Sequence, residues 1–473
     1  MLTNLDWIGT GNPFPPDCER KRMDRYEANE KLFEGKHNDV FGTEFKKLAD
    51  YLKKRNVDVN TVINYPQLLT KKTADFVCGE MPEITVGKKK SDELNDILDN
   101  MGFANVLYEA VMDISRFGDS PVKVLEDRVS IVPPKNWYPI VDEYDAKHIK
   151  EHVIAFRAGK EIYVEIHDIG KYEIRRYEAQ ESAGKEKGLQ FGKLIKTSTK
   201  STNVDDFAIK VFSNVGHSMS VYGIDDYGIV SDILRQLMWR LYCMDIILDK
   251  HSMPSMTGPG SALTDDPITG KKILITGSYF ERNRQDDAKP EYLTWDGNLQ
   301  AVQWEIDWLT NQLYTLSEMG AAFLEGAGKG EANSGTALRL RMTSPLIKAR
   351  RIAGINTQTL KQVVRLVAMA NNMKIDTKDI AAAWKDGLPD DRRENAEILA
   401  MATGNKPFMS QTTAVKEWGD LDDEATQQEM DLIETEHVAQ APALFTPMEI
   451  RDEQNAGVDR EVRNGGSRDQ GGD

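Results

Sequence analysis

The chain has 473 residues, of which 40% are hydrophobic and 29% are charged, and its formal net charge is -16. A chain of this length exceeds one ordinary hydrophobic core, so we expect roughly two to four sub-domains. The acidity argues against a sequence-specific nucleic-acid reader, because such proteins usually present a basic domain to the phosphates.

The cysteines and the apolar stretches exclude further classes of protein. Cys18, Cys78 and Cys243 are far apart and odd in number, so neither a zinc site nor a disulfide framework is indicated. We expect buried, reduced thiols. The first residues lack the basic start and apolar run of a signal peptide. No uncharged apolar stretch of about 18 residues or more predicts a membrane span.

The N-terminal part of the chain is predicted to be mainly helical. Residues 1–21 have little pattern and are expected to form an extended arm. A short helix over 22–35 follows and ends at a glycine. A helix over 65–77, which tolerates Pro66 in its first turn, leads through a Gly-x-x-Pro turn to a strand over 83–86.

The pattern then changes from helices to strands. Two amphipathic helices are expected between Ser91 and Phe117, and Gly118-Asp-Ser-Pro121 predicts a turn. Alternating apolar residues predict antiparallel strands over 122–125, 128–132, 152–156, 161–166, 172–177 and 207–212. Residues 181–203 are rich in Lys, Gly, Ser and Thr, so we expect a mobile hairpin tip or loop there.

Two long helices enclose a region of turns. Residues 225–250 carry apolar side chains every three to four positions, which predicts a long helix. Residues 251–300 hold prolines, glycines and two candidate strands, 272–276 and 291–294. A second long helix is expected over 301–325, where Trp304 and Trp308 share one face.

A glycine-rich break separates that helix from the next. Residues 326–333 read Gly-Ala-Gly-Lys-Gly-Glu-Ala-Asn, and so many glycines are too costly for a helix interior. After Ser334, a plausible N-cap, a helix is expected over 336–373. Ser344-Pro345 and Gly354 are expected to bend it.

The C-terminal part is acidic and predicted to be mostly helical. A short strand within 375–384 and a helix over 388–400 are expected. A Ser-x-x-Thr start then opens a short helix, and an acidic helix ends near Glu436. Residues 437–473 have no sustained period and are expected to be flexible.

The order of long helix, glycine loop and Ser-Gly-Thr-Ala-Leu-Arg-Leu-Arg leading a bent helix resembles the portal, or head-to-tail connector, proteins of tailed bacteriophages. The resemblance covers roughly residues 22–436. It implies an α+β protomer with a mixed α/β wing, two long stem helices, a small β-containing clip and a helical crown. It also implies a closed ring, expected to be a dodecamer, with the glycine loop as the tunnel loop in an axial DNA channel.

The resemblance places these parts along the chain. They are an arm over 1–21, a wing over 22–224, a stem helix over 225–250, a clip over 251–300, a second stem helix over 301–325, a tunnel loop over 326–334, a bent helix completing the wing over 335–390, a crown over 391–436 and a flexible tail over 437–473.

The same resemblance implies the partners and the location. Double-stranded DNA would pass without sequence preference during packaging and ejection, while a separate ATPase drives it. The terminase large subunit, a head-completion adaptor, and the major capsid and scaffolding proteins would bind the ring. The protein would be made in the host cytoplasm and reside at the portal vertex of the virion, with no cofactor and no enzymatic activity.

The charge distribution agrees with a surface along which DNA slides, since tight phosphate contacts would hold the polyanion in place. Residues 375–436 carry six Lys/Arg against sixteen Asp/Glu, a net of -10, and would repel DNA. Residues 325–351 carry a net of +4, from Lys329, Arg339, Arg341, Lys348, Arg350 and Arg351 against Glu325 and Glu331.

These charges define the candidate site residues. The residues expected to face DNA are Gly326, Gly328, Lys329, Gly330, Glu331 and Asn333. The candidates for the channel or for contacts between subunits are Arg235, Arg240, Arg339, Arg341 and Lys348. For Lys329 we favour proximity to DNA, and for Arg339 and Arg341 a solvated face or ion pairs with the next subunit. Trp304 and Trp308 are expected to pack between subunits.

Other chemistries find little support in the sequence. Gly326-Ala-Gly-Lys-Gly330 is not a P-loop, because a helix precedes it and glycine follows the lysine. It also does not match the dinucleotide fingerprint. The seven histidines show no metal-ligand spacing, and no carboxylate pair stands out. The rival reading, a phage nuclease or transferase, lacks a carboxylate cluster in a strand context.

Overall fold

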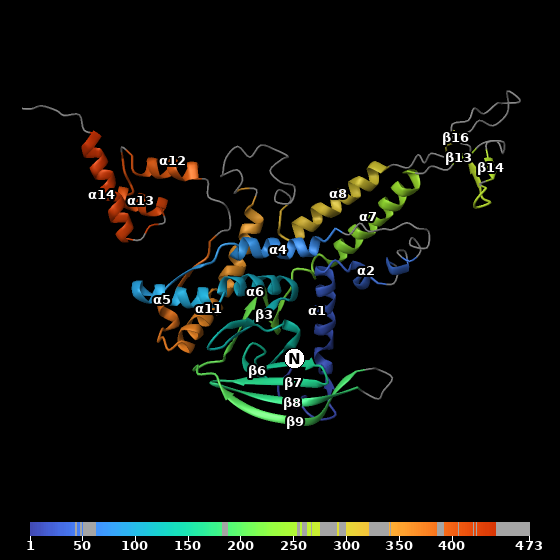
Figure 1. Ribbon diagram of the computed structural model, residues 1–473, viewed down its shortest axis with the longest axis horizontal. Coiled ribbons are helices and arrows are strands. Elements are labelled where there is room, and N and C mark those ends of the chain that lie inside the picture. The colour runs from blue at the N-terminus through green and yellow to red at the C-terminus, as the bar shows by residue number, and fades with distance from the viewer. Residues whose placement is uncertain are drawn as a thin grey trace, which may run out of the picture. The chain divides into compact units, whose positions relative to one another are not determined.

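The computed structural model describes most of the chain, in two compact units, Met1–Pro389 and Asp390–Asp473 (Figure 1). The described residues are 1–42, 45–47, 50, 63–181, 188–252, 256–257, 263–265, 267–274, 291–292, 299–320, 340, 342–385, 392–404, 406–419, 421 and 423–440. The fold is α+β, as predicted.

The first unit combines helices with several antiparallel sheets. Its helices are α1 (Arg20–Phe33), α2 (His37–Val40), α4 (Tyr65–Cys78), α5 (Gly87–Asn100), α6 (Phe103–Phe117), α7 (Ser231–Ser252), α8 (Leu299–Leu316) and α11 (Thr343–Ala370), with 3-10 turns η1 (Asp17–Glu19), η2 (Pro134–Asn136) and η4 (Thr377–Asp379).

The largest sheet has six strands in the order β1-β9-β8-β7-β6-β5. The strands are β1 (Pro13–Phe14), β5 (Trp137–Val141), β6 (Ile149–Ala158), β7 (Glu161–Asp168), β8 (Lys171–Glu181) and β9 (Leu189–Ser201). Residues 181–203 were expected to form a mobile hairpin tip or loop. Residues 189–201 instead form β9, which pairs with β8 with register shifts, and residues 182–187 lie outside the described residues. The prediction is wrong for β9, because its exposed Lys, Ser and Thr residues are ordered by backbone pairing with β8.

Smaller sheets connect the helices. They are β10-β3-β4, β11-β12, β17-β2, β13-β16 and β14-β15. Their strands are β2 (Glu83–Thr85), β3 (Asp119–Val124), β4 (Val129–Ile131), β10 (Ile209–Ser213), β11 (Val215–His217), β12 (Ser220–Ile224), β13 (Met256–Thr257), β14 (Leu263–Asp265), β15 (Lys272–Leu274), β16 (Glu291–Tyr292) and β17 (Ala381–Ala383).

The turn predicted at Gly118–Pro121 is shorter than expected. Gly118 has a φ of +91°, so it ends α6, and β3 begins at the next residue. A Cβ on Gly118 would lie 2.5 Å from the carbonyl oxygen of Gly223. Glycine is therefore required there both by conformation and by this close approach of two backbones.

Two hydrophobic cores hold the sheets. One joins the buried faces of α4, α5, α6 and α11 to β3 and β10. The other packs the N-terminal arm onto the six-stranded sheet, where Trp7 lies 5.1 Å from Tyr138 and Phe14 lies 5.4 Å from Phe191, between ring centroids. The arm was expected to be extended, and instead its turns bury aromatic side chains and β1 extends the sheet.

A buried arginine ties α1 to the sheets. Arg22 donates to Glu19 Oε2 at 2.6 Å, to the carbonyl of Pro134 at 3.0 Å and to that of Trp137 at 2.9 Å. Its guanidinium carbon lies 4.4 Å from the ring centroid of Tyr222. The charge is thus paired with Glu19, and two backbone carbonyls accept its remaining hydrogen bonds, as a buried cation requires.

The three cysteines of the first unit differ in exposure. Cys78 is buried and Cys243 half-buried, but Cys18 is exposed, so the prediction of three buried thiols is wrong for Cys18.

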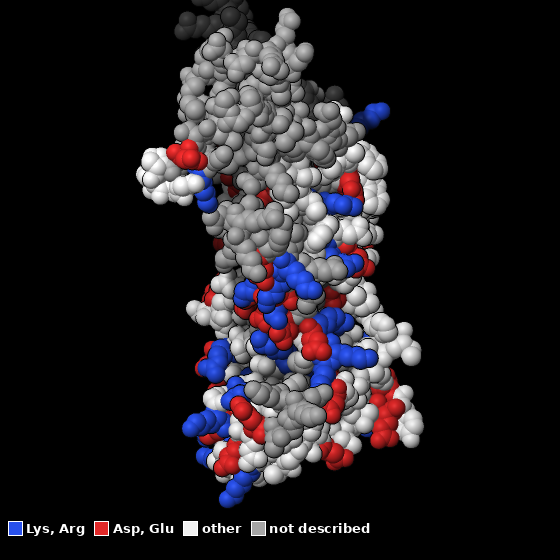
Figure 2. Space-filling model, turned by 90° about the vertical axis from the view of Figure 1, so that its right-hand side faces the viewer, with Lys and Arg blue, Asp and Glu red and all other residues white. Residues whose placement is uncertain are grey.

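Figure 2 shows Lys and Arg interspersed with Asp and Glu over the described part of one face, rather than a surface of one charge sign.

The second unit consists of three helices in its described part. They are α12 (Arg392–Ala402), α13 (Gln411–Gly419) and α14 (Asp423–Gln440). The predicted Ser-x-x-Thr start is present: Ser410 Oγ accepts a hydrogen bond from the backbone N–H of Thr413 at 3.1 Å. This unit begins next to the start expected for the crown.

Candidate functional site

The two long helices predicted around residues 251–300 are present and pair with each other. Figure 1 shows α7 and α8 side by side. Their seam is apolar, formed by Leu234, Leu237, Met238, Tyr242, Leu309, Leu313 and Tyr314. Arg240 Nε lies 2.8 Å from Glu305 Oε1 across the seam. The apolar stripes at helical spacing are therefore used to join these two helices.

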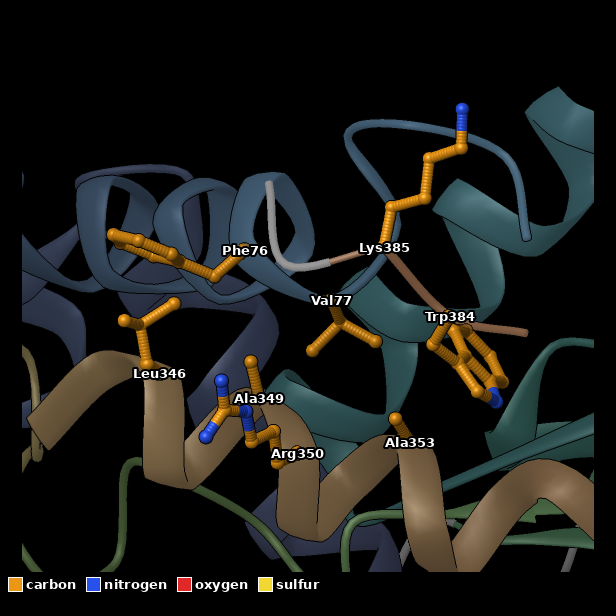
Figure 3. Close-up of a pocket in the computed structure, with 8 residues that line it drawn as sticks. All are labelled: Phe76, Val77, Leu346, Ala349, Arg350, Ala353, Trp384 and Lys385. Carbon is orange, nitrogen blue, oxygen red and sulfur yellow. The ribbon is translucent and has the colours of Figure 1, made fainter. Parts of the chain in front are cut away.

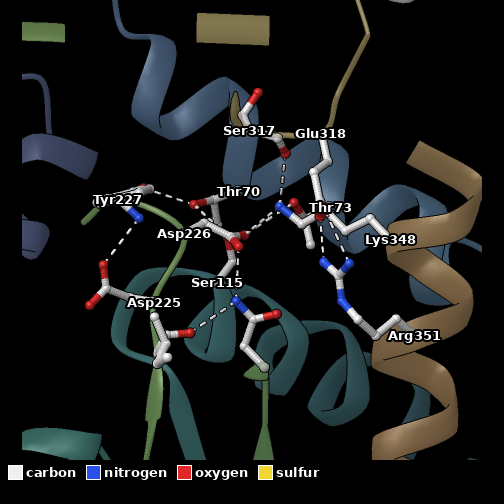
Figure 4. A network of polar contacts seen from close by, with 12 residues as sticks. Thr70, Thr73, Ser115, Asp225, Asp226, Tyr227, Ser317, Glu318, Lys348 and Arg351 are labelled. Atoms are coloured by element: carbon white, nitrogen blue, oxygen red, sulfur yellow. Dashed lines mark hydrogen bonds and ion pairs between the residues drawn. The ribbon is translucent and has the colours of Figure 1, made fainter. Parts of the chain in front are cut away.

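A buried polar network lies just before the start of α7 and just after the end of α8 (Figure 4). Its centre is Asp226, in the link between β12 and α7. Asp226 Oδ2 accepts from Ser115 Oγ at 2.7 Å, and Asp226 Oδ1 accepts from Asn214 Nδ2 at 2.8 Å. The ammonium of Lys348 lies 2.9 Å from Asp226 Oδ2. These donors satisfy a carboxylate that would otherwise be costly to bury.

Neighbouring residues fix the link on either side of Asp226. Asp225 Oδ1 accepts from the backbone N–H groups of Tyr227 and Gly228 at 3.0 and 2.8 Å. Burial raises the pKa of Tyr227, so the phenol stays protonated and donates to the carbonyl of Pro66 at 2.9 Å. Thr70 Oγ1 lies 2.7 Å from the same phenol. The start of α7 is thereby attached to α4.

The same network holds the base of the 321–341 segment, which contains the predicted glycine loop. The helix α8 ends at Leu316, and Glu318 and Gly320 have φ values of +61° and +69°. The chain was expected to remain helical to residue 325. Lys348 Nζ donates to the carbonyl of Ser317 at 3.2 Å, so one ammonium joins the end of α8 to Asp226 and α11.

A second, more exposed ion pair also fixes the end of α8 to α11. Arg351 on α11 pairs with both carboxylate oxygens of Glu318, with Nη1 3.1 Å from Oε1 and Nη2 hydrogen-bonded to Oε2. Ser344 Oγ donates to the carbonyl of Glu318 at 3.1 Å. We call Ser317, Glu318, Ser344, Lys348 and Arg351, together with Asp226, the loop-base clamp. It brings both ends of the intervening segment to one place.

The predicted site residues fall into three groups. Gly326, Gly328, Lys329, Gly330, Glu331, Asn333, Arg339 and Arg341 lie outside the described residues. Arg240 pairs with Glu305 within the chain, and Arg235 is exposed on α7. Lys348 was expected to face a channel or a neighbouring subunit, but its exposed fraction is 3% and its ammonium is bound to Asp226. That expectation is wrong, because the cation belongs to the protomer's interior.

Pro345 and the two tryptophans also differ in detail from expectation. The helix α11 begins at Thr343, so Pro345 lies in its first turn, where no intrahelical hydrogen bond is lost. Trp304 and Trp308 lie on α8 with exposed fractions of 69% and 48%. They take no part in the seam with α7, and their contacts between subunits stay a prediction.

A cavity of about 310 Å³ lies beside the loop-base clamp (Figure 3). The C-terminal end of α4 and the first half of α11 supply its walls, with Phe76, Val77, Leu346, Ala349 and Ala353. Trp384 Nε1 donates to Thr357 Oγ1 at 3.0 Å, and Lys385 lies 3.5 Å from Glu80. Most of the lining residues are apolar, Arg350 and Lys385 being the charged ones, and the described part of the chain offers no convergent set of polar groups for catalysis.

Among the described residues, no three His, Cys, Asp or Glu side chains are grouped so that they could hold a metal ion. No described helix is long and apolar enough to cross a bilayer.

The network therefore fixes the start of α7, the end of α8 and α11 to one another. Comparison with known proteins identifies the class. The chain matches the family model described as "Phage portal protein, SPP1 Gp6-like" over residues 15–443. No curated protein matches it.

Three solved structures are similar at low sequence identity. A chain of "Virion of native gene transfer agent (GTA) particle" has a TM-score of 0.45 and 10% identity, and the match covers 87% of this chain and 96% of that chain. "Neck of native GTA particle computed with C12 symmetry" gives 0.44 and 10%, with the same coverage. "Neck of empty GTA particle computed with C6 symmetry" gives 0.44 and 11%, again over 87% and 96%.

The family match spans most of the chain, so this protein belongs to the SPP1 Gp6-like family of phage portal proteins. The predicted relation to bacteriophage portals is confirmed. Members of this family are structural proteins of the virion, at the connection between head and tail.

Most residues that hold the loop base carry no signal in the sequence. Asp226, Ser317 and Glu318 were not predicted as site residues, and Arg351 entered only the net charge of residues 325–351, since their partners lie far away in the sequence. The only available signal was Asp225-Asp226 directly before a long apolar-periodic helix, where acidic residues are favoured by the helix dipole.

Proposed function

We propose that copies of this chain assemble into a closed ring, with twelve subunits, at one vertex of a capsid. Double-stranded DNA passes through the axial hole during packaging and ejection. The family supports this proposal. In this arrangement α7 and α8 are the stem, the strands between them belong to the clip, and residues 326–334 are the tunnel loop.

The observation that carries the proposal is the loop-base clamp. A loop that touches moving DNA needs a fixed base, and Lys348 holds Ser317, Asp226 and α11 together in the protein interior. The segment between the clamped ends contains three glycines within residues 326–330 and carries Lys329. Repeated around a ring, Lys329 would supply weak, salt-sensitive contacts to phosphates.

The partners follow from a portal's position. The ring binds the terminase large subunit during packaging and a head-completion adaptor afterwards, and it contacts the major capsid and scaffolding proteins during assembly. The chain supplies no catalysis in this scheme, and a separate ATPase moves the DNA.

Electron microscopy of the purified full chain in negative stain tests the ring. The expected result is a particle with rotational symmetry and a central hole, together with a solution mass near that of twelve protomers. A compact monomer under every condition tried would show the proposal to be wrong.

The role of Lys329 is tested separately. Lys329→Glu should reduce DNA packaging or retention while rings still assemble, because it replaces a circle of cations with anions near the phosphates. Lys160→Glu, an equal charge reversal at an exposed position of the β6–β7 hairpin, is the matched control. Packaging by Lys329→Glu at the level of the control would contradict a DNA-facing role.

A further inference from the structure

The second unit buries very little of its own apolar surface. Among its described residues, Ala402, Ala414 and Thr426 are the buried ones. Large apolar side chains are exposed instead: Ile398, Met401, Phe408, Trp418 and Leu432, with exposed fractions between 50% and 83%. Partly buried apolar side chains, among them Leu399, Val415 and Ile433, supply the rest of the apolar contact among its helices. Exposed large apolar side chains of this number are typical of a surface that binds another surface.

The helix α12 is apolar on two opposite faces. One face lines a groove of about 270 Å³, together with α13 and Ile433 of α14. That face consists of Ala396, Leu399, Ala400 and Thr403. Ile398 and Met401 form an exposed ridge, which lies about 180° around the axis from the centre of the groove face at 100° per residue. A helix apolar on both sides is normally packed between two surfaces.

The groove can accept an inserted side chain. Three alanines, Ala396, Ala400 and Ala414, line it together with Leu399, Val415 and Trp418. Its volume of about 270 Å³ leaves room for an aliphatic side chain. Met401 is unbranched and adaptable, so it suits an irregular groove.

We propose that the ridge of one copy, Ile398 and Met401, packs into the groove between α12, α13 and α14 of the next copy. Both halves of the contact are present on every copy, and this favours a second copy over an unrelated partner. Because ridge and groove are different surfaces, the contact is heterologous and repeats head to tail, closing if the rotation closes. This inference rests on the proposed ring, and it assigns to the second unit an additional set of contacts between copies.

The dependence of binding on salt distinguishes a second copy of this chain from a cationic partner in the groove. Residues 391–440 carry four Lys/Arg against twelve Asp/Glu. Neighbouring copies therefore repel each other electrostatically, and the apolar contact must outweigh that repulsion. Salt screens like charges, so raising the ionic strength should strengthen the contact. A cationic amphipathic helix in the same groove would show the opposite dependence.

Disulfide cross-linking of the full-length chain tests the geometry. The variant is Ile398→Cys with Thr403→Cys, in a Cys18→Ser background because Cys18 is exposed. Within one helix these positions are about 8 Å apart between Cα atoms and face different sides, which is too far for an intrachain disulfide. Oxidised rings should give a ladder of covalent multimers that extends past the dimer. Each single-cysteine variant, the matched control, should stop at the dimer.

The outcomes separate this inference from the proposed ring. Rings that form normally in the microscope but give no ladder beyond the dimer would overturn the ridge-and-groove contact and leave the ring standing. A wild-type chain that stays monomeric overturns both.

A second measurement uses hydrogen exchange in the assembled wild-type protein. Met401→Asp should increase exchange in α12–α14 about tenfold or more while α4 and α6 keep their protection, and Met401→Leu should match the wild type. Protection should rise between about 0.05 and about 0.5 M salt. Protection that appears only when a Lys/Leu amphipathic helical peptide is added would assign the groove to a cationic partner and overturn the contact between copies.

Discussion

Replacement of Lys348 by methionine tests the loop-base clamp most directly. The ammonium lies 2.9 Å from Asp226 Oδ2 and 3.2 Å from the carbonyl oxygen of Ser317. The residue's exposed fraction is 3%. Removing one partner of a buried ion pair leaves the other charge without compensation and typically costs about 3–5 kcal/mol. We expect Lys348→Met to lower the free energy of unfolding of the first unit by that amount.

The double variant Lys348→Met with Asp226→Asn isolates the cause. An amide at position 226 still accepts from Ser115, and no buried charge remains unpaired. The double variant should therefore be more stable than Lys348→Met alone by about 1 kcal/mol or more, which is a non-additive outcome of the kind that contacting residues show.

Urea unfolding followed by far-UV circular dichroism at fixed protein concentration measures these differences. Arg350→Met removes a cation from an exposed position of the same helix and should stay within about 0.5 kcal/mol of the wild type. A loss of less than about 1 kcal/mol for Lys348→Met, or strict additivity in the double variant, would refute the reasoning.

Two further predictions concern pH and the exposed clamp. Burial raises the pKa of Asp119 from 3.8 to about 7, where its carboxylate accepts from the backbone N–H of Gly223 and from Tyr26. The folded state therefore keeps a proton that the unfolded state releases between these pH values, and this contribution to stability is present below pH 3.8 and lost as the pH rises towards 7. Asp119→Asn should flatten the dependence of stability on pH across this window, and an unchanged slope in parallel urea titrations would contradict the assignment. Glu318→Ala should cost at most about 1 kcal/mol, because its pair with Arg351 is partly exposed. It should still speed tryptic cleavage between residues 321 and 341, and a cleavage rate equal to that of the wild type would show that the pair does not hold the segment.

Local signals in the sequence were enough for much of the helical structure. Pro66 marked the first turn of α4, and the structure shows Asn64 accepting from the backbone N–H of Gln67 at 3.2 Å. The apolar spacing likewise predicted α7 and α8 as long helices, although it did not predict that they pair. The interactions that decide whether a helix forms lie within a few residues of one another, so composition and period contain them.

Features that depend on distant partners could not be predicted in this way. Lys348 on an amphipathic helix has the same sequence signature whether it is solvated or buried, and its partner Asp226 lies more than a hundred residues earlier in the chain. The strand β9 has few apolar residues, because its outer half is exposed and its order comes from pairing with β8. The sequence therefore favoured loop for β9 and a surface cation for Lys348, and tertiary contacts override both.

The two parts of the loop-base clamp differ in strength, and their order follows from burial. The outer pair, Glu318 with Arg351, is partly exposed and is worth at most about 1 kcal/mol. The inner pair, Lys348 with Asp226, is buried and costs about 3–5 kcal/mol to break. A pull on the intervening segment should therefore open the outer pair first, while Lys348 continues to hold α8, α11 and the start of α7 together. The outer pair can therefore open without unfolding the helices α8 and α11, as the proposed contact of the intervening segment with passing DNA would require.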